Sequence, residues 1–447
     1  MDRYLVVGAG VSGIAACKLL NEKGFDFILY DGNAGLNVKE LKRKNTFLAD
    51  RQVVCGKFPE ELCEETDICV LSPGVPVELP FVELLRDKGV VISGEIELAY
   101  SMGKGRVCAI TGTNGKTTTT ALVGEIVSMA FSDTRVVGNI GIPYTSVAGT
   151  TTDESVIVAE ISSFQLETIS TFKPHISAIL NITPDHLDRH HTMESYIAAK
   201  ERITENQDVS DYCVLNYDDE VLREFGKTLK CDVIWFSSSV KLEDGVYYDN
   251  GALWQAKNGE SDKLIDTKEL NILGVHNYEN ACAAVAICSA LGISPDIIRK
   301  GLREFKAVAH RIEFICEKKG VKFYDDSKGT NPDAAIKAVL AMEGPTLLIG
   351  GGYDKDASYD EWVDAFFGRV KKLILIGATA DKIEECARNK GFTDIIRADG
   401  LKEAVDAAYE LAEEGDSVLL SPACASWDMF KNYEERGRLF AKYSREL

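Results

Sequence analysis

The chain has 447 residues, of which 45% are hydrophobic and 27% charged, a composition typical of a globular protein with more than one core. Its formal net charge of −20 argues against binding to nucleic acid or to an anionic membrane surface. No apolar run approaches the roughly 18 residues of a transmembrane helix, and the N-terminal residues do not have the pattern of a signal peptide. The 12 cysteines include no Cys-x-x-Cys pair and several lie in apolar runs, as in a reducing compartment. We therefore expect a cytoplasmic protein without membrane insertion.

The first segment alternates strands and helices around a glycine-rich turn. We predict strands over 4–7, 27–30 and 68–71 and a helix over 14–23. Residues 8–13, Gly-Ala-Gly-Val-Ser-Gly, follow the first strand, and Asp31 ends the second, which is the spacing of a dinucleotide fingerprint. The same turn suits any diphosphate at a helix N-terminus. NAD and a nucleoside diphosphate both remain open, and a second nucleotide site downstream favours the latter.

The second segment contains a strand, a glycine-rich turn and a helix. Residues 111–118, Thr-Gly-Thr-Asn-Gly-Lys-Thr-Thr, lie between an apolar strand over 107–110 and a helix predicted over 119–129. In such a turn, backbone N–H groups face an anion, Lys116 neutralises phosphate charge and Thr117 can hold Mg²⁺. The turn is shorter than the standard phosphate-binding loop, because Ile110 stands where that motif has its first glycine. An ordinary tight turn is the alternative, but the placement favours ATP or another nucleoside triphosphate.

Two polar clusters follow later strands of this segment. Glu160 ends a strand predicted over 156–159, where an acid beside the phosphate loop is a typical Mg²⁺ ligand, although it could instead cap the next helix. Residues 181–191 then read Asn-Ile-Thr-Pro-Asp-His-Leu-Asp-Arg-His-His. Oxygen ligands with one imidazole suit Mg²⁺ or Mn²⁺ better than zinc. For His190 and His191, a place on the surface is as good an interpretation as a place in the metal site. Lys200 is interpreted as a solvated charge on a helix.

Short β-like pieces between 236 and 272 and an alanine-rich helix over 278–291 precede a third α/β segment. In this segment, polar loops at 309–313, 324–332, 350–355 and 421–430 follow or flank predicted strands and indicate a site. Cys424 is interpreted as a packed thiol, since no base is identifiable beside it. We predict an α/β fold of three domains: a Rossmann-like domain over 1–94, a central P-loop-type ATPase domain with a parallel sheet over 95–307, and a Rossmann-like domain over 308–447.

Taken in order, the motifs resemble those of the Mur ligases, ATP-dependent amide-forming enzymes of peptidoglycan synthesis. The resemblance extends over the whole chain and is carried by residues 111–118, 160–163, 181–188, His276-Asn277 with Asn280, His310-Arg311 and 326–331. The turn 8–13, Ser72-Pro-Gly74 and especially residues 421–426, Ser-Pro-Ala-Cys-Ala-Ser, are similar to those of members that add D-glutamate. The Asp-Asn-Pro-Arg-type motif of diaminopimelate-adding members is not found, and folylpolyglutamate synthases lack the first segment.

The resemblance implies a reaction and its small-molecule substrates. The carboxylate of UDP-N-acetylmuramoyl-L-alanine takes the γ-phosphoryl group of ATP, and the amine of D-glutamate attacks the resulting acyl phosphate. Such chemistry needs charge neutralisation and alignment more than a nucleophile. By resemblance, Thr117 and Glu160 hold one Mg²⁺, and Glu160, His186 and a carbamylated Lys200 hold a second. The catalytic residues implied are Lys116, Glu160, His186, Lys200 and Lys328.

The resemblance also implies three groups of binding residues. ATP would contact Gly112, Thr113, Asn114, Gly115, Lys116, Thr117, Thr118, Asn277, Asn280, Arg311 and Asp326. The UDP substrate would contact Val11, Ser12, Asp31, Gly74, Asn139 and Ser162, although Gly32 and Asn33 lack the hydroxyl and basic groups of some members. D-Glutamate would contact Thr330, Lys355, Ser426, Trp427 and Tyr433. Because these residues come from all three segments, we expect domain closure, and we expect a monomer.

Three alternatives remain at this point. A sibling ligase would add a different amino acid with the same chemistry. An NAD-dependent oxidoreductase would use the first segment and leave the phosphate loop and Glu160 unexplained. A regulatory nucleotide-binding module would not need phosphate-facing and cation-binding groups in separate domains.

Overall fold

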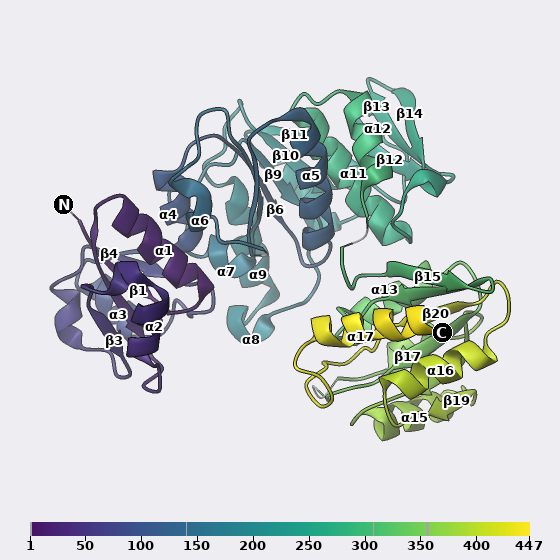
Figure 1. The fold of residues 1–447 in the computed structure, drawn as a ribbon. Helices are drawn as coiled ribbons and strands as arrows, with labels where there is room; N and C mark the ends of the chain where they lie inside the picture. Colours follow the sequence, from purple (N-terminus) through teal and green to yellow (C-terminus); the bar gives the residue numbers. More distant parts are fainter. Residues whose placement is uncertain (1, 140, 307, 355–356) are drawn as a thin grey trace. The chain divides into compact units, whose positions relative to one another are not determined.

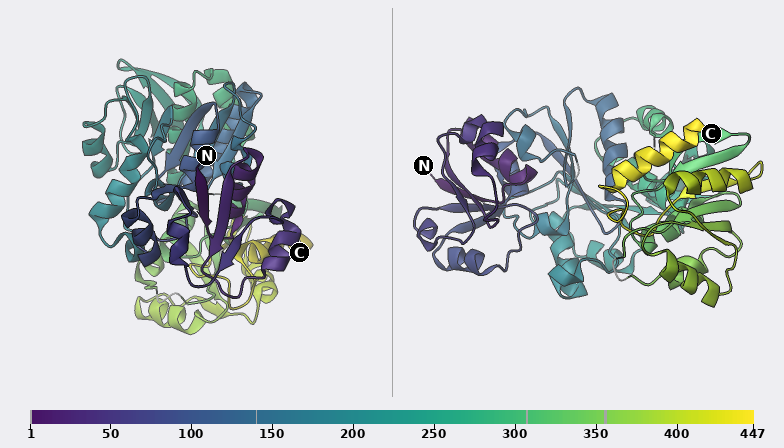
Figure 2. Two further views of the ribbon diagram at one scale, coloured as in Figure 1. Left: turned by 90° about the vertical axis from the view of Figure 1, so that its left-hand side faces the viewer. Right: turned by 60° about the horizontal axis from the view of Figure 1, so that its bottom comes forward.

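The computed structural model describes residues 2–139, 141–306, 308–354 and 357–447. It divides into two compact units, Met1–Ile265 with Glu279–Leu302 and Asp266–Tyr278 with Arg303–Leu447 (Figure 1). The first unit contains two sheets and the second contains one. Helices lie against each sheet, as the views in Figure 2 show. The α/β fold class predicted from the sequence is confirmed, whereas the boundaries 94/95 and 307/308 stay predictions.

The first sheet has five parallel strands in the order β3-β2-β1-β4-β5. The strands are β1 Arg3–Val7, β2 Asp26–Asp31, β3 Val53–Cys55, β4 Ile68–Leu71 and β5 Val91–Gly94. The helices are α1 Val11–Glu22, α2 Val38–Lys44, α3 Pro80–Asp87 and α4 Glu95–Met102, with 3₁₀ turns η1 Thr46–Leu48 and η2 Glu60–Cys63. The order reverses between β1 and β4, the place where such sheets bind ligands. A side chain at Gly13 would collide with the Gly8 carbonyl oxygen, so this turn requires glycine.

The second sheet has nine strands in the order β14-β13-β12-β11-β10-β9-β6-β8-β7. The strands are β6 Arg106–Thr111, β7 Thr134–Gly138, β8 Val156–Glu160, β9 Ile176–Ile179, β10 Tyr212–Asn216, β11 Asp232–Ser237, β12 Gly245–Asp249, β13 Ala252–Lys257 and β14 Glu260–Asp266. Its strands pair in parallel from β7 to β12, but β12 and β13 pair antiparallel. The predicted parallel sheet is therefore extended by a hairpin at the Asn250-Gly251 turn, where both residues have positive φ.

The helices of this part of the chain connect or cover those strands. They are α5 Lys116–Ala130, α6 Thr145–Ala148, α7 Ser163–Leu166, α8 Leu187–His190, α9 Met193–Glu201, α10 Glu220–Gly226, α11 Val275–Ala290 and α12 Pro295–Glu304, with 3₁₀ turns η3 Arg202–Thr204 and η4 Thr267–Glu269. Helix α5 begins at Lys116, directly after Gly115, which has a left-handed φ of 84°. The helix that follows the phosphate loop therefore begins three residues earlier than the sequence predicts.

The third sheet has six strands in the order β15-β16-β20-β17-β18-β19, and all its pairs except β15–β16 are parallel. The strands are β15 Glu313–Lys318, β16 Val321–Asp325, β17 Thr346–Gly350, β18 Val370–Leu375, β19 Ile395–Arg397 and β20 Ser417–Leu420. The helices are α13 Pro332–Ala341, α14 Asp360–Asp364, α15 Ala380–Asn389, α16 Leu401–Leu411 and α17 Tyr433–Glu446. Along β20, Leu419 packs with α13–α15 while Val418 and Leu420 pack with α16 and α17, so both faces are buried.

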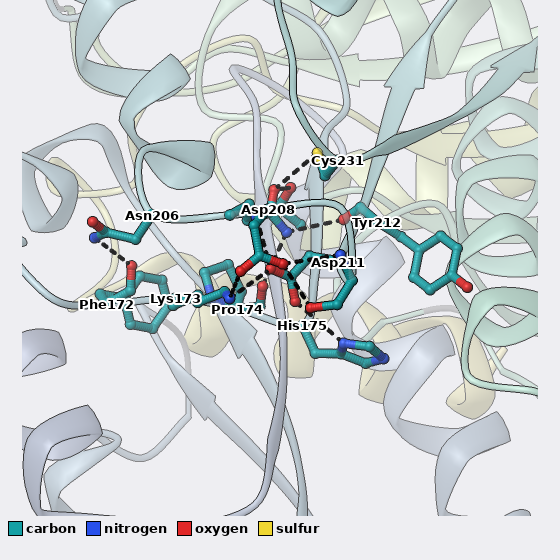
Figure 3. A network of polar contacts seen from close by, with 12 residues as sticks. Phe172, Lys173, Pro174, His175, Asn206, Asp208, Asp211, Tyr212 and Cys231 are labelled. Carbon is teal, nitrogen blue, oxygen red and sulfur yellow. Dashed lines mark hydrogen bonds and ion pairs between the residues drawn. The ribbon is translucent and has the colours of Figure 1, made fainter.

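A polar network lies at the amino ends of β9 and β10, the edge of the sheet away from the phosphate loop (Figure 3). Lys173 Nζ contacts carboxylates of Asp208 and Asp211 at 2.6 and 3.2 Å, and His175 Nδ1 lies 3.4 Å from Asp211. The Gln207 amide donates to the Pro174 and Tyr212 carbonyl oxygens. In parallel sheets the carboxyl ends of the strands carry the chemistry. We therefore interpret this network as structural.

Candidate active site

The register of the second sheet brings three polar segments to one edge. Ile110 of β6 pairs with Glu160 of β8, and Thr111 pairs with Ile179 of β9. The phosphate loop, Glu160 and the segment after β9 therefore leave the sheet side by side. Hydrogen bonds join two of them, because Thr113 N–H donates to the Asn181 carbonyl oxygen and Asn114 N–H to its side-chain oxygen, at 2.9 and 2.8 Å.

Two lysines converge on the phosphate loop. Lys116 Nζ donates to the carbonyl oxygens of Gly112 and Thr113 at 2.7 and 2.9 Å. Lys200 Nζ donates to the same Gly112 oxygen at 2.8 Å, and Lys200 is only 1% exposed. Burial, and then the Lys116 charge, lower the pKa of Lys200 to about 7. The interpretation of Lys200 as a solvated helix charge is wrong, because α9 directs it into the sheet edge rather than to solvent.

Tyr196 supports this arrangement and was missed by sequence reasoning. Its hydroxyl hydrogen-bonds Thr113 Oγ1 at 3.1 Å, and its ring centroid lies 4.7 Å from Lys200 Nζ. The side chain is 1% exposed. A tyrosine four residues before Lys200 on the same helix face was the available signal.

Glu160 is 2% exposed, and its two carboxylate oxygens have different surroundings. Oε1 accepts a hydrogen bond from Asn139 Nδ2 at 2.9 Å, whereas Oε2 has no hydrogen-bond partner among the described residues. Buried polar atoms normally have a partner, so an orphaned carboxylate oxygen beside a phosphate loop fits a cation ligand. Asn139, predicted to contact the UDP substrate, is thus also a residue that orients Glu160. The half-buried Thr117 is the second residue of α5, beside the loop.

The histidines after β9 have three different environments. His186 is half-exposed, has a left-handed φ of 52° and lies edge-on to the Phe164 ring at 5.0 Å. His190 is 6% exposed and shares a 2.9 Å hydrogen bond with Ser163 Oγ. His191 is exposed and lies 3.1 Å from Glu78. The surface interpretation is therefore right for His191 and wrong for His190, which lies one helical turn after His186 and points inward.

The residues predicted to bind the UDP substrate lie at two sheet edges of the first unit. The Asp31 carboxylate accepts hydrogen bonds from Ala9 N–H and Asn33 N–H at 2.7 and 2.8 Å, which fixes the glycine-rich turn. The others at the first sheet are Val11, Ser12 and Gly74, around the carboxyl ends of β1 and β4. Ser162, which follows β8, caps α7 in a capping box with Gln165. Asn139 follows β7.

In the second unit, the carboxyl ends of β16, β20 and β17 meet, since Leu420 lies between Asp325 and Ile349 in register. Asp326 is 4% exposed and accepts a 2.7 Å hydrogen bond from Ser421 Oγ. Burial raises the pKa of Asp326 to about 7. Arg311 Nε is buried without a hydrogen-bond partner among the described residues, and its charge lowers the Asp326 pKa against the effect of burial.

The described residues predicted to bind D-glutamate, and the predicted catalytic residue Lys328, lie on or near the same loops. Lys328 Nζ is 5.9 Å from the Tyr433 ring centroid, Ser426 is buried, and Trp427 is 63% exposed with its ring 5.5 Å from that of Tyr353. Thr330 N–H donates to the Lys328 carbonyl oxygen. Lys355 lies outside the described residues.

Arg436 of α17 joins two of these loops and was also missed. It is 1% exposed, and its guanidinium donates to Ser327 Oγ and to the carbonyl oxygens of Ser327 and Cys424 at 2.9, 2.9 and 3.1 Å. Burial lowers the pKa of Arg436 to about 10. A buried arginine that donates to backbone carbonyls fixes the loops at 326–330 and 421–426 with respect to each other.

The residues predicted to contact ATP are divided between the units. Residues 112–118 and Asn280 belong to the first unit, and Asn277, Arg311 and Asp326 to the second. Within the first unit, a side chain at Gly115 would collide with the Asn280 amide oxygen, so Asn280 lies against the phosphate loop. The convergence of the two groups stays a prediction. Within the described residues, no helix has the length and apolar character needed to cross a membrane.

A phosphate loop, a buried acid and polar strand-end loops on parallel-rich sheets define an α/β nucleotide-using enzyme. Three family models match the chain: the MurD-like N-terminal domain of Mur ligases over residues 2–94, the Mur ligase middle domain over 110–288 and the Mur ligase glutamate ligase domain over 310–424. The chain belongs to the Mur ligase family and is an ATP-dependent ligase.

Curated relatives match over the full length. A UDP-N-acetylmuramoylalanine–D-glutamate ligase of Lachnoclostridium phytofermentans is 51% identical over 445 residues, covering 100% of this chain and 98% of the relative. One of a Thermoanaerobacter species is 52% identical with the same coverage. Among solved structures, UDP-N-acetylmuramate-alanine ligase from Thermotoga maritima matches with a TM-score of 0.62 at 18% identity, covering 100% of this chain and 99% of the other. At that identity the structural likeness shows the fold alone.

The raised pKa of Asp326 predicts a stability gain on neutralisation. Because burial raises the Asp326 pKa from 3.8 to about 7, ionisation of this carboxyl destabilises the fold. The destabilisation is absent below pH 3.8, grows as the pH rises and is complete above about pH 7. Asp326→Asn should therefore have a higher thermal midpoint than the parent at pH 8. Its free energy of unfolding should be larger by at most about 4 kcal/mol, and the gain should shrink towards pH 4. Equal thermal midpoints at pH 8 would contradict this account. The exposed Asp333→Asn should change stability by less than about 1 kcal/mol.

Loss of the Arg436 side chain should leave buried acceptors on two loops without a donor. Arg436→Leu is expected to lower the free energy of unfolding by about 3 kcal/mol. The matched control is Arg438→Leu on the same helix, where the side chain is exposed and the expected change is within about 1 kcal/mol. Chemical denaturation of the three proteins measures this, and similar losses for both variants would remove the loop-joining role.

Proposed function

We propose that the protein joins D-glutamate to UDP-N-acetylmuramoyl-L-alanine at the expense of ATP, in the cytoplasmic part of peptidoglycan synthesis. The observation that carries this proposal is full-length identity of about half the residues to curated D-glutamate ligases. The strand-end geometry supports it, because the loops that meet at each sheet edge contain the groups that such a reaction needs. A monomeric state stays a prediction.

The first unit fits a nucleoside triphosphate with a divalent cation. The phosphate loop needs glycine at 112 and 115, where φ is 150° and 84° and a side chain would crowd Leu180 or collide with Asn280. The orphaned Glu160 Oε2 lies at the same edge. Lys116, Thr117 and Thr118 would hold the triphosphate, with Mg²⁺ held by Thr117 and Glu160 and a second Mg²⁺ by Glu160, His186 and Lys200. When bound, Mg²⁺ reduces the negative charge of the phosphate oxygens.

The residues of the chain then act mainly by charge and by position. In the proposed reaction, the L-alanine carboxylate takes the terminal phosphoryl group, and the D-glutamate amine replaces phosphate on that carbonyl to form the amide. Lys116 supplies positive charge in a chain of net charge −20, and Asn139 keeps the Glu160 carboxylate oriented. Lys328 would face the transferred phosphate from the second unit.

Lys200 is proposed to act as a carbamate. Its amine nitrogen would attack carbon dioxide, form an N–C bond and lose one proton, which converts a cationic group into an anionic oxygen ligand. Only the neutral amine can react, and a pKa of about 7 makes that form available near neutral pH. Burial against Gly112 O holds the group at the edge where Glu160 lies.

The other substrates would bind at the remaining strand ends. Thr330, Ser426, Trp427 and Tyr433, with Lys355, would hold D-glutamate, and the loops fixed by Arg436 would give that pocket its shape. Asp31, Ser12 and Gly74 would hold the uridine end of the UDP substrate. The oxidoreductase alternative has less support, because it gives no role to the glycine-dependent phosphate loop or to the buried Glu160 carboxylate.

The proposed function predicts phosphate release that depends on all three substrates. With ATP and UDP-N-acetylmuramoyl-L-alanine present, D-glutamate should stimulate release, whereas L-glutamate, L-alanine and diaminopimelate should not. Lys116→Ala should reduce the rate by roughly 100-fold or more, because it removes charge stabilisation at the phosphates. The exposed Lys104→Ala is the control and should retain the parent rate. Stimulation by another amino acid instead would identify a sibling ligase.

The carbamate predicts a signal that can be observed directly. In ¹³C-bicarbonate, the parent should show a carbamate resonance in the ¹³C NMR spectrum that Lys200→Met lacks, and it should weaken as the pH falls through 7, because protonation removes the reactive amine. Removal of dissolved carbon dioxide should lower the ligase rate, and added bicarbonate should restore it. An unchanged rate without carbon dioxide, together with no resonance, would refute this role.

A further inference from the structure

A serine, a histidine and a glutamate form a chain of contacts behind the site. His190 Nε2 shares a 2.9 Å hydrogen bond with Ser163 Oγ, and His190 Nδ1 lies 3.6 Å from Glu167 Oε1. Ser163 begins α7, Glu167 follows its last residue and His190 ends α8. The chain of contacts therefore ties the helix after β8 to the helix after β9.

This arrangement does not have the accessibility of a hydrolytic triad. A nucleophilic serine must be open to its substrate. Ser163 is 3% exposed and His190 is 6% exposed. The ring of Phe164 also stacks on His190, with centroids 5.4 Å apart and planes at 22°. The three residues therefore hold each other rather than attack a substrate.

Phe164 connects this cluster to His186. One ring face is stacked on His190, and the guanidinium of Arg189 lies 4.4 Å from the ring centroid. His186 meets the same ring edge-on at 5.0 Å. The His186 side chain is half-exposed, and its backbone has a left-handed φ that only surrounding structure keeps in place. Phe164 is thus in direct edge-on contact with the His186 imidazole.

Arg189 extends the cluster to the first sheet. Its Nη2 atom donates to Glu167 Oε2 at 2.6 Å and to the Val75 carbonyl oxygen at 3.2 Å. Val75 follows Gly74, in the loop after β4. Glu167 therefore contacts both His190 and Arg189, and Arg189 joins α8 to a loop of the proposed UDP subsite.

We propose that Ser163, His190 and Glu167 are positioning residues that hold Phe164 against the His186 imidazole and so set the affinity of the site for a divalent cation. This inference rests on the proposed role of His186 as a cation ligand. Residues in direct contact with a metal ligand commonly change metal affinity 10- to 100-fold when they are removed. Ser163, His190 and Glu167 act through Phe164, so their effect should lie at or below the lower end of that range. The neighbouring His191 is a matched control, because it is exposed and contacts none of these groups among its described interactions.

The test is a titration of the full chain with Mn²⁺ in the presence of ADP, followed by electron paramagnetic resonance. His190→Phe and Ser163→Ala should weaken Mn²⁺ binding by up to roughly 10-fold. His190→Gln, whose amide can keep the Ser163 hydrogen bond, should recover part of that loss. His191→Gln should bind Mn²⁺ as the parent does. The apparent constant for Mg²⁺ in the ligase assay should rise in the same order, with the KM for D-glutamate nearly unchanged.

The outcomes separate this inference from the proposed function. Lower thermal midpoints with unchanged Mn²⁺ affinity would show a merely structural role and overturn the proposal, as would a parent that binds no Mn²⁺. If His190→Phe does not fold, the smaller change Ser163→Ala decides the question alone. If the variants bind Mn²⁺ more weakly than a parent that shows no D-glutamate-dependent phosphate release, the result would support the positioning role and refute the substrate assignment.

Discussion

Two ammonium groups donate to one carbonyl oxygen, that of Gly112, and much of the site depends on this interaction. Lys116 reaches it from the first turn of α5, and Lys200 reaches it from α9. Burial, and then repulsion by the Lys116 charge, lower the Lys200 pKa to about 7. An anion in the loop would relieve the repulsion, as would conversion of Lys200 to an anionic group. The same electrostatic conflict therefore favours both a phosphate ligand and a modified lysine, although the chain as a whole is strongly acidic.

The parallel register makes this concentration of charge possible. Where neighbouring parallel strands end at the same level, the loops that follow them lie at one edge of the sheet. This arrangement occurs in each of the three sheets of the described residues. The pairing of Ile110 with Glu160 places a carboxylate beside the phosphate loop at a distance in sequence that no local motif could bridge. In the third sheet, insertion of β20 between β16 and β17 does the same for the loops at 326–330 and 421–426. The polar network at the opposite edge, with Lys173 and Asp211, lies instead at the amino ends of β9 and β10.

The sequence predicted those parts of the molecule that local patterns determine. The strand, glycine turn and helix around Lys116 could be predicted because backbone geometry requires glycine there, and Glu160 because a strand end is visible in its apolar run. Lys200 could not be selected from its own neighbourhood, since its burial results from the packing of α9 against the loop. It entered only through family resemblance. His190 left a weak signal, its spacing of four residues from His186, but its inward direction depends on Ser163 from another strand end.

The residues that sequence reasoning missed share one physical feature. Tyr196, His190 and Arg436 all project from helices. Tyr196 and Arg436 hydrogen-bond loops that carry the proposed chemistry, and His190 hydrogen-bonds Ser163 at the start of α7. Polar loops at strand ends have little regular structure of their own, so their side chains can hold a fixed geometry only if something rigid behind them accepts or donates hydrogen bonds. Sequence patterns reveal the reactive residue types, because chemistry restricts which side chains can serve. They reveal the supports poorly, because a support needs only a suitable donor at a position that the tertiary fold defines. For a site built from strand-end loops, the helices behind the sheet edges are consequently where further functional residues should be sought.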